Sequence, residues 1–249
     1  MRVVLVCLLL SSFLCGNFSY GKVPEKEITE IFNQRLNDLT TPEAFKKFVA
    51  DHTNLFPDHT KENPSMVVER EGLIVNDETF TLAIGYRQVA IDSKNADFIK
   101  SLWAAPELFK KIYNLDGESK VAEADFNKNK FKARIYKKVP AIEDQDYTLE
   151  YTSTTKAPYT FIRAKLVKDE KGFALRDNLK VLEETKDGLI IREISYLYPL
   201  RWYVRALGPT TRSMMKKEMN KISLTEKRLT EESTNFPPSD ELIEKCIKN

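Results

Sequence analysis

The sequence predicts an α+β fold in which a curved antiparallel β-sheet wraps around one long C-terminal helix. Between Ser119 and Leu200, six short strand-like runs follow one another with brief turns between them. From Arg201 onward, the spacing of apolar residues changes to that of an amphipathic helix. A sheet that curls around a helix without filling its own concavity leaves an apolar cavity, so ligand binding is the leading functional interpretation.

Length and charge narrow the class of protein. A chain of 249 residues suits one sizeable domain with small appendages. The 39 Lys and Arg residues nearly balance the 37 Asp and Glu residues, and a net charge of +2 gives no reason to expect nucleic acid as a partner. His52 and His59 are not at ligand spacing and Cys246 is the only cysteine beyond residue 15, so we expect neither a metal nor another cofactor.

The first 21 residues have the pattern of an export signal. Met1 and Arg2 precede an apolar run, and small residues at Ser19 and Gly21 fit cleavage before Lys22. The apolar run is shorter than the ~20 residues that span a bilayer, which disfavours an uncleaved anchor. A lipid anchor on Cys15 is disfavoured because Leu14 precedes it. We therefore expect an exported protein, periplasmic or secreted.

The chain after the signal divides into three further parts. Residues 22–64 form an N-terminal helical extension, with helices at Glu27 to Leu39 and Pro42 to Asp51 and then a proline-containing loop. Residues 65–230 form the main domain, and residues 231–249 form a tail with a short helix at Ser239 to Ile247.

The main domain begins with two strands within Met66 to Ile91, which a turn at Asn76 and Asp77 separates. Two small helices follow between Asp92 and Tyr113, and then the six strands. Their expected bounds are Ser119 to Asp125, Lys130 to Lys138, Gln145 to Thr154, Tyr159 to Lys168, Phe173 to Glu183 and Leu189 to Leu200. The last helix begins near Arg201 and is kinked or split at Gly208-Pro209, because proline lacks the backbone donor that a helix needs.

This order of elements resembles the START-like superfamily, which includes lipid-transfer START domains, polyketide cyclases and dehydratases, and coenzyme Q-binding proteins. The similarity lies in the stretch from Val89 to Ser93, in Phe98, Ile99 and Leu102-Trp103, and in Pro106 with Leu108-Phe109. The resemblance covers about residues 66 to 230. It implies a helix-grip fold, in which a seven-stranded antiparallel sheet encloses the last helix and an internal pocket for a hydrophobic ligand.

If that geometry holds, the pocket is lined by strand side chains and by the facing side of the last helix. The candidate ligand-binding residues are Tyr86, Tyr147, Tyr151, Asp177, Arg192, Tyr196, Trp202 and Met215. For the apolar members, ordinary core packing is the alternative. Tyrosines on an apolar wall supply hydroxyls that orient a ligand, although buried tyrosines also bond to backbone.

Asp177 is the sharpest of these positions, because apolar residues share its face and a carboxylate among them is costly unless it is paired. It is a candidate proton donor or ligand anchor. The alternatives are a surface position and an ion pair with Arg163 or Arg192. Arg192 beside Glu193 raises the same question on the next strand, since both faces there are partly apolar and one of the pair should be inside.

Three functional interpretations follow. The first is an exported protein that binds a hydrophobic small molecule or lipid, with transient membrane contact possible through the basic side of the last helix. The second is a cyclase or dehydratase that uses pocket acids and tyrosines, such as Asp177 and Tyr151, to move protons on a polyketide-like substrate. The third is a structural domain with a filled core. We expect no catalytic residues, because the chain has no nucleophile elbow, no phosphate-binding loop and no inward histidine.

Overall fold

The structure of the protein is a computed structural model of the whole chain. It describes residues 25–57, 65–75, 78–92, 119–127, 130–137, 144–171, 173–199, 208–233 and 238–248. The predicted export signal and the two helices predicted between Asp92 and Tyr113 lie almost entirely outside these ranges, as do residues 200–207 at the predicted start of the last helix.

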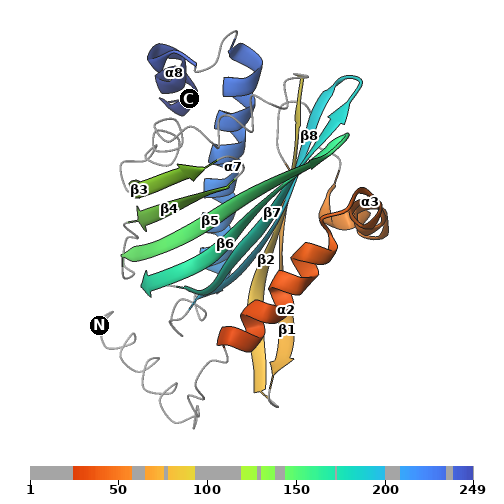
Figure 1. The fold of residues 1–249 in the computed structure, drawn as a ribbon, viewed down its shortest axis with the longest axis vertical. Helices are drawn as coiled ribbons and strands as arrows, with labels where there is room; N and C mark the ends of the chain where they lie inside the picture. The colour runs from red at the N-terminus through yellow and green to blue at the C-terminus, as the bar shows by residue number, and fades with distance from the viewer. Residues whose placement is uncertain are drawn as a thin grey trace, which may run out of the picture.

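The core of the fold is an antiparallel sheet of eight strands in the order β1-β2-β8-β7-β6-β5-β4-β3 (Figure 1). The chain passes from β2 to β3 at the opposite edge and returns strand by strand until β8 pairs with β2. The strands are β1 (Ser65–Val75), β2 (Glu78–Ile91), β3 (Ser119–Asn127), β4 (Lys130–Lys137), β5 (Gln145–Lys156), β6 (Tyr159–Lys171), β7 (Phe173–Thr185) and β8 (Gly188–Pro199).

These strands confirm the curved antiparallel sheet that the alternation predicts, with bounds that differ by a few residues. The START-like resemblance implies seven strands, whereas the sheet of this protein has eight among the described residues. β1 pairs with β2 along its whole length, from Ser65 opposite Gln88 to Val75 opposite Glu78, and adds an eighth strand at one edge. The sequence predicts this pairing, because the apolar runs of β1 and β2 are separated by only two polar residues.

Four α-helices and one 3-10 helix are described with the sheet. They are α2 (Glu25–Asp38), α3 (Pro42–Asp51), η1 (Thr53–Leu55), α7 (Gly208–Glu232) and α8 (Asp240–Lys248). The start of α3 is fixed as the sequence predicts, because Pro42 occupies the first turn and the hydroxyl of Thr41 accepts a hydrogen bond of 3.3 Å from the backbone N–H of Ala44. No described helix is long and apolar enough to cross a membrane.

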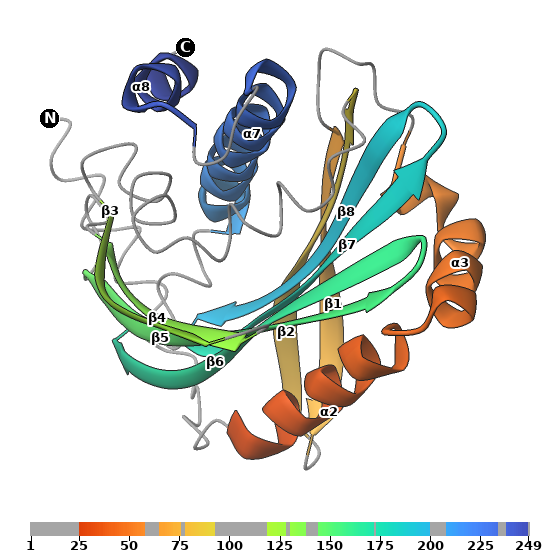
Figure 2. The ribbon, with the colours of Figure 1, turned by 45° about the horizontal axis from the view of Figure 1, so that its top comes forward.

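The sheet is curved, and the helices divide between its two faces (Figure 2). α7 and α8 lie on the concave side, while α2 and α3 lie on the convex side. Each face has its own apolar cluster. The concave cluster joins strand residues to Leu229 of α7 and to Ile243 and Cys246 of α8, and the convex cluster joins other strand residues to Ile28, Phe32, Leu36 and Phe45. Cys246 is a buried free thiol.

Candidate functional site

The alternation of side chains along each strand decides which predicted site residues can meet. Tyr147 and Tyr151 belong to the concave cluster, whereas Tyr86 and Tyr196 belong to the convex cluster beneath α2, α3 and η1. On β7, Asp177 alternates in step with Leu179 and Val181 of the convex cluster, so its side chain points to the convex face as well.

On β8, Arg192 is two residues from Ile194 of the convex cluster, so its side chain points to the convex face. The expectation that Tyr86, Asp177, Arg192 and Tyr196 line one pocket with Tyr147 and Tyr151 is therefore wrong, because the sheet itself separates the two sets. Trp202 lies outside the described residues, and Met215 lies in α7 at a position whose side chain is not described.

An apolar wall covers the concave face at β4, β5 and β6. Phe131 lies directly opposite Tyr151, and Tyr151 opposite Ala164, in the register of the three strands. The rings of Phe131 and Tyr151 are stacked, with centroids 4.3 Å apart and planes 5° from parallel. The wall consists of Phe131, Ala133, Ile135, Tyr147, Leu149, Tyr151, Ile162 and Ala164, all of them buried.

On the same concave face, a row of charged side chains continues from this wall across β7, β8 and β2. Ile162 lies opposite Lys180, Lys180 opposite Glu193, and Glu193 opposite Arg87, so three adjacent strands present a cation, an anion and a cation at one level. Opposite charges that face each other across strands attract. This row, together with the residues of α7 that reach it, is called the charged ladder below.

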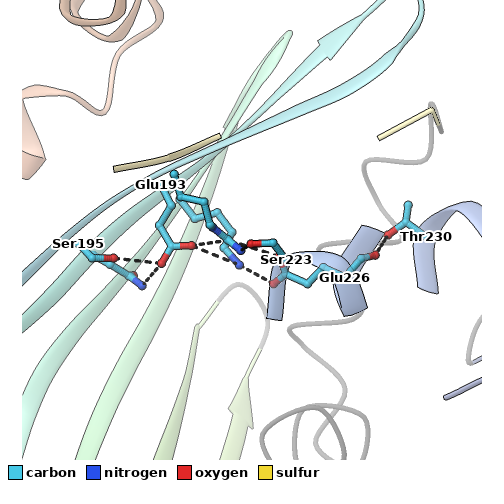
Figure 3. A network of polar contacts seen from close by, with 8 residues as sticks. Glu193, Ser195, Ser223, Glu226 and Thr230 are labelled. Carbon is cyan, nitrogen blue, oxygen red and sulfur yellow. Dashed lines mark hydrogen bonds and ion pairs between the residues drawn. The ribbon is translucent and has the colours of Figure 1, made fainter. Parts of the chain in front are cut away.

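α7 completes the charged ladder from above (Figure 3). Glu226 Oε1 accepts a hydrogen bond of 2.7 Å from Lys180 Nζ, and Glu226 Oε2 lies 3.4 Å from Arg87 Nη2. Arg87 also donates from Nη1 to the hydroxyl of Ser223 and from Nη2 to Glu193 Oε2. The side chains of Arg87 and Glu226 are 1% and 0% exposed, which makes this a fully buried ionic contact between sheet and helix.

Glu193 is the centre of the charged ladder. Its Oε1 accepts hydrogen bonds from Asn178 Nδ2 at 2.9 Å and from the hydroxyl of Ser195 at 3.2 Å. Its Oε2 is bonded to Arg87 and lies 3.9 Å from Lys180 Nζ. Burial by itself raises the pKa of Glu193, but the neighbouring cations Arg87 and Lys180 outweigh it and hold the pKa below its ordinary value.

The charges of the ladder balance, because Arg87 and Lys180 face Glu193 and Glu226. Burial lowers the pKa of Lys180 despite the two glutamates, while the same glutamates raise the pKa of Arg87 against its burial. A balanced buried set adds little net stability compared with apolar residues, but it is costly to break and it fixes geometry. We interpret the charged ladder as the device that sets where α7 lies on the concave face.

The sequence did contain a signal for one residue of the charged ladder. Arg87 interrupts an apolar set on β2, because it shares its side of the strand with Ala83, Val89 and Ile91. Lys180 and Glu226 have mostly polar neighbours on their own elements, and no such signal marks them in the sequence. From the sequence, one of Arg192 and Glu193 is expected to point into the interior. Both have largely buried side chains, on opposite faces, with Glu193 facing α7 and Arg192 facing away from it.

The predicted site residues on the convex face have structural partners. Arg192 Nε donates to Gln88 Oε1 at 2.6 Å, and its Nη1 is bonded to Glu183, which also accepts from the hydroxyl of Tyr159 at 3.0 Å. Burial raises the pKa of Tyr86 and of Tyr196. Asp177 pairs with Arg163, one of the two partners that the sequence suggested.

No group of His, Cys, Asp and Glu residues that could hold a metal ion occurs within the described ranges.

Comparisons with known proteins give similarity in fold. No family model matches the chain, and no curated protein sequence matches it.

Among solved structures, the chain is similar to human STARD10, with 13% identity over 74% of this chain and 80% of that one and a TM-score of 0.46. It is also similar to the Zhui aromatase/cyclase from a Streptomyces species, with 9% identity over 59% of this chain and 94% of that one and a TM-score of 0.44.

The lipid transfer and protein localization domain of human StarD13 gives 12% identity over 74% and 96% of the two chains, with a TM-score of 0.43. STARD10 and StarD13 are START proteins, the group that the sequence resembles. At these identities the likeness concerns the fold alone, and it says nothing about the ligand of this chain.

Proposed function

We propose that this protein is an exported binding protein that holds a hydrophobic small molecule or lipid between the apolar wall of the concave face and α7. The observation that carries the proposal is the division of the concave face into an apolar wall at β4 to β6 and a buried charged ladder that anchors α7 at β7, β8 and β2. The charged ladder attaches the helix at one side of the sheet, and in this proposal the buried apolar wall beside it supplies the surface that contacts the ligand.

The two parts suit an amphipathic molecule. The apolar wall would contact its hydrocarbon portion, and burial of hydrocarbon contributes about 25 cal/mol per Å². Arg87 Nε is buried and has no hydrogen-bond partner among the described residues, so one N–H of the ladder remains for a polar group. Lys216 and Lys217 are exposed on α7 and would support a transient contact with a membrane surface during loading.

The enzyme alternative loses the pair of residues on which it depended. Tyr151 faces α7 on the concave side, whereas Asp177 lies on the convex side, so the two side chains cannot act on one bound substrate. A proton donor must come within hydrogen-bond reach of the reacting atom. The binding function needs no such pair, and we therefore favour it.

Native mass spectrometry of protein purified without detergent tests the proposal. We expect a co-purifying hydrophobic molecule in the wild type. Ala133→Met places a larger side chain in the apolar wall, and we expect its ligand occupancy or affinity to fall about tenfold, which corresponds to ~1.4 kcal/mol.

Thr152→Val is the matched control, because Thr152 is exposed on the opposite face of the same sheet and its replacement should leave occupancy unchanged. Thermal unfolding of both variants separates loss of ligand from loss of folding. The proposal is wrong if the wild type carries no molecule and takes up neither a fluorescent fatty acid nor a fluorescent phospholipid. That result would favour the structural domain with a filled core.

Export is proposed from residues 1–21, on the charged start, the apolar run and the small residues Ser19 and Gly21. Expression of the full chain in a secreting host should give a mature protein whose N-terminal sequence begins at Lys22. An intact N-terminus in the cell interior would contradict the proposal.

A further inference from the structure

A buried carboxylate lies on the convex face of the sheet, away from the proposed ligand site. The side chain of Asp177 on β7 is 0% exposed. Its Oδ1 accepts a hydrogen bond of 3.0 Å from the backbone N–H of Leu166. Its Oδ2 has no hydrogen-bond partner among the described residues, because Arg163 Nη2 lies 3.9 Å away, within ion-pair range but beyond hydrogen-bond distance.

Two residues of α2 contact the neighbours of this carboxylate. Asn33 Oδ1 accepts a hydrogen bond of 3.2 Å from Arg163 Nη2, the same nitrogen that faces Asp177. The ring of Phe32 lies 4.4 Å from that of Tyr196, and Tyr196 is directly opposite Asp177 in the β7–β8 register. α2 therefore helps to keep water away from Asp177, and lifting the helix would return the carboxylate to solvent.

Burial raises the pKa of Asp177, and it outweighs the opposing effects of the Leu166 N–H and of the cations Arg163 and Lys165. A carboxyl group whose pKa is raised on folding favours the folded state most below the ordinary carboxyl range. That contribution is lost as the pH rises through the raised pKa. Because α2 contributes to the burial, docking of α2 and protonation of Asp177 must favour each other reciprocally.

We propose that α2 is a proton-sensitive cover of the convex face, which seats firmly when Asp177 is protonated and lifts more readily when Asp177 is ionised. Lifting α2 would remove Ile28, Phe32 and Leu36 from the convex cluster and uncover strand side chains of that cluster. These include Leu82, Ile84, Phe161, Leu179 and Ile194, a surface suited to a hydrophobic partner.

The other charged groups near Asp177 would not produce the same pH dependence of α2 docking. Arg163 on β6, Arg35 on α2 and Tyr196 on β8 keep one protonation state between acidic and neutral pH. Lys165 on β6 is a further cation near Asp177. The carboxylates of this region are Glu69 and Glu71 on the convex side of β1, of which Glu69 is exposed, and the acidic residues of α2 itself, Glu25, Glu27, Glu30 and Asp38. Glu71 pairs with Arg35 of α2 at 2.6 Å. Protonation of Glu71 would weaken that ion pair and loosen α2, so its effect on docking has the opposite sign.

Amide hydrogen exchange across α2 in the full chain measures the cover directly. In the wild type, the opening equilibrium of α2, corrected for the intrinsic exchange rate, should rise on the order of tenfold between acidic and neutral pH, a typical size for the coupling between two linked events. Asp177→Asn keeps the acceptor for Leu166 and removes the charge. We expect α2 in this variant to stay protected at neutral pH and to lose the rise.

Glu71→Gln is the matched control and should retain the rise. Asp177→Ser provides a second variant without the carboxylate if the asparagine variant folds poorly. Binding of an anilinonaphthalene dye should increase toward neutral pH in the wild type, opposite to the acid-induced exposure of ordinary partly unfolded states. An opening equilibrium that is independent of pH, or a rise that persists in both Asp177 variants, would overturn the proposal.

Discussion

The concave face of the sheet contacts α7 through a buried ionic network as well as apolar side chains, whereas the convex face contacts α2 and α3 mainly through aromatic and aliphatic side chains. On the concave face, Arg87 and Lys180 contact Ser223 and Glu226 of α7, and Glu193 pairs with Arg87. On the convex face, α2 and α3 place Ile28, Phe32, Leu36 and Phe45 against the apolar side chains of β1, β2, β6, β7 and β8.

The difference teaches how one sheet can hold two helical layers with different precision. An apolar contact is non-directional and tolerates small shifts of the helix. A buried ionic contact is favourable only when its geometry is good and its remaining donors and acceptors are satisfied. The concave helix α7 is therefore fixed in register with β2, β7 and β8. The convex helices α2 and α3 are held by the apolar surface that they bury, and α2 packs over the region of Asp177.

The largest expected effect comes from breaking the charged ladder. Arg87→Met leaves Glu193 and Glu226 with Lys180 as the remaining cation of the ladder, and we expect a loss of about 3–5 kcal/mol in the free energy of unfolding. Arg192→Met on the opposite face is the matched control. Its partner Glu183 is 24% exposed and can be hydrated, so we expect a loss of about 1 kcal/mol.

Urea denaturation of the two arginine variants checks this contrast. In a double-mutant cycle, Arg87→Met and Glu193→Gln should together cost less than the sum of their separate effects, by about 0.5–3 kcal/mol, because they belong to one network. Equal losses for Arg87→Met and Arg192→Met would show that the concave contact is no more demanding than the convex one.

A smaller effect is expected from the convex face. Leu36→Ala removes buried hydrocarbon between α2 and the sheet, where Leu36 is 0% exposed, and we expect a loss of about 2–3 kcal/mol because α2 can settle toward the gap. The same denaturation measurement checks it. Combined with Arg87→Met, the two losses should add within about 0.5 kcal/mol, since the sheet separates the sites. A larger coupling energy would mean that the two faces do not act independently.

The predicted strands agree with the structure because their signal is local. In β4 and β5, Phe131, Ala133 and Ile135 alternate with Lys130, Lys132 and Arg134, so one face is apolar and the other polar, and alternation alone gives both the strand and its buried side. Tyr147 and Tyr151 were placed correctly relative to each other for this reason.

The same signal fails in β2, β7 and β8, where both faces are buried. Tyr86 and Arg87 are both buried, as are Asp177 and Lys180, so the period of two assigns each residue to a set without saying which set faces α7. The sequence analysis combined members of both sets in one pocket. The helical pair α2 and α3 covers the convex face, and that cover is what removes the usual difference between wet and dry sides.

By itself the sequence determined the antiparallel strands, the two N-terminal helices and the helical character of the C-terminal region, because each follows from a repeating pattern or a cap within a few residues. The tertiary structure alone decided which side of the sheet each buried side chain faces, since that depends on packing between segments far apart in the chain. It brought Arg87, Lys180 and Glu193 to Glu226 of α7, and it placed Asp177 beneath α2. Charges separated by up to about 140 residues form one contact only after the whole sheet has closed between them.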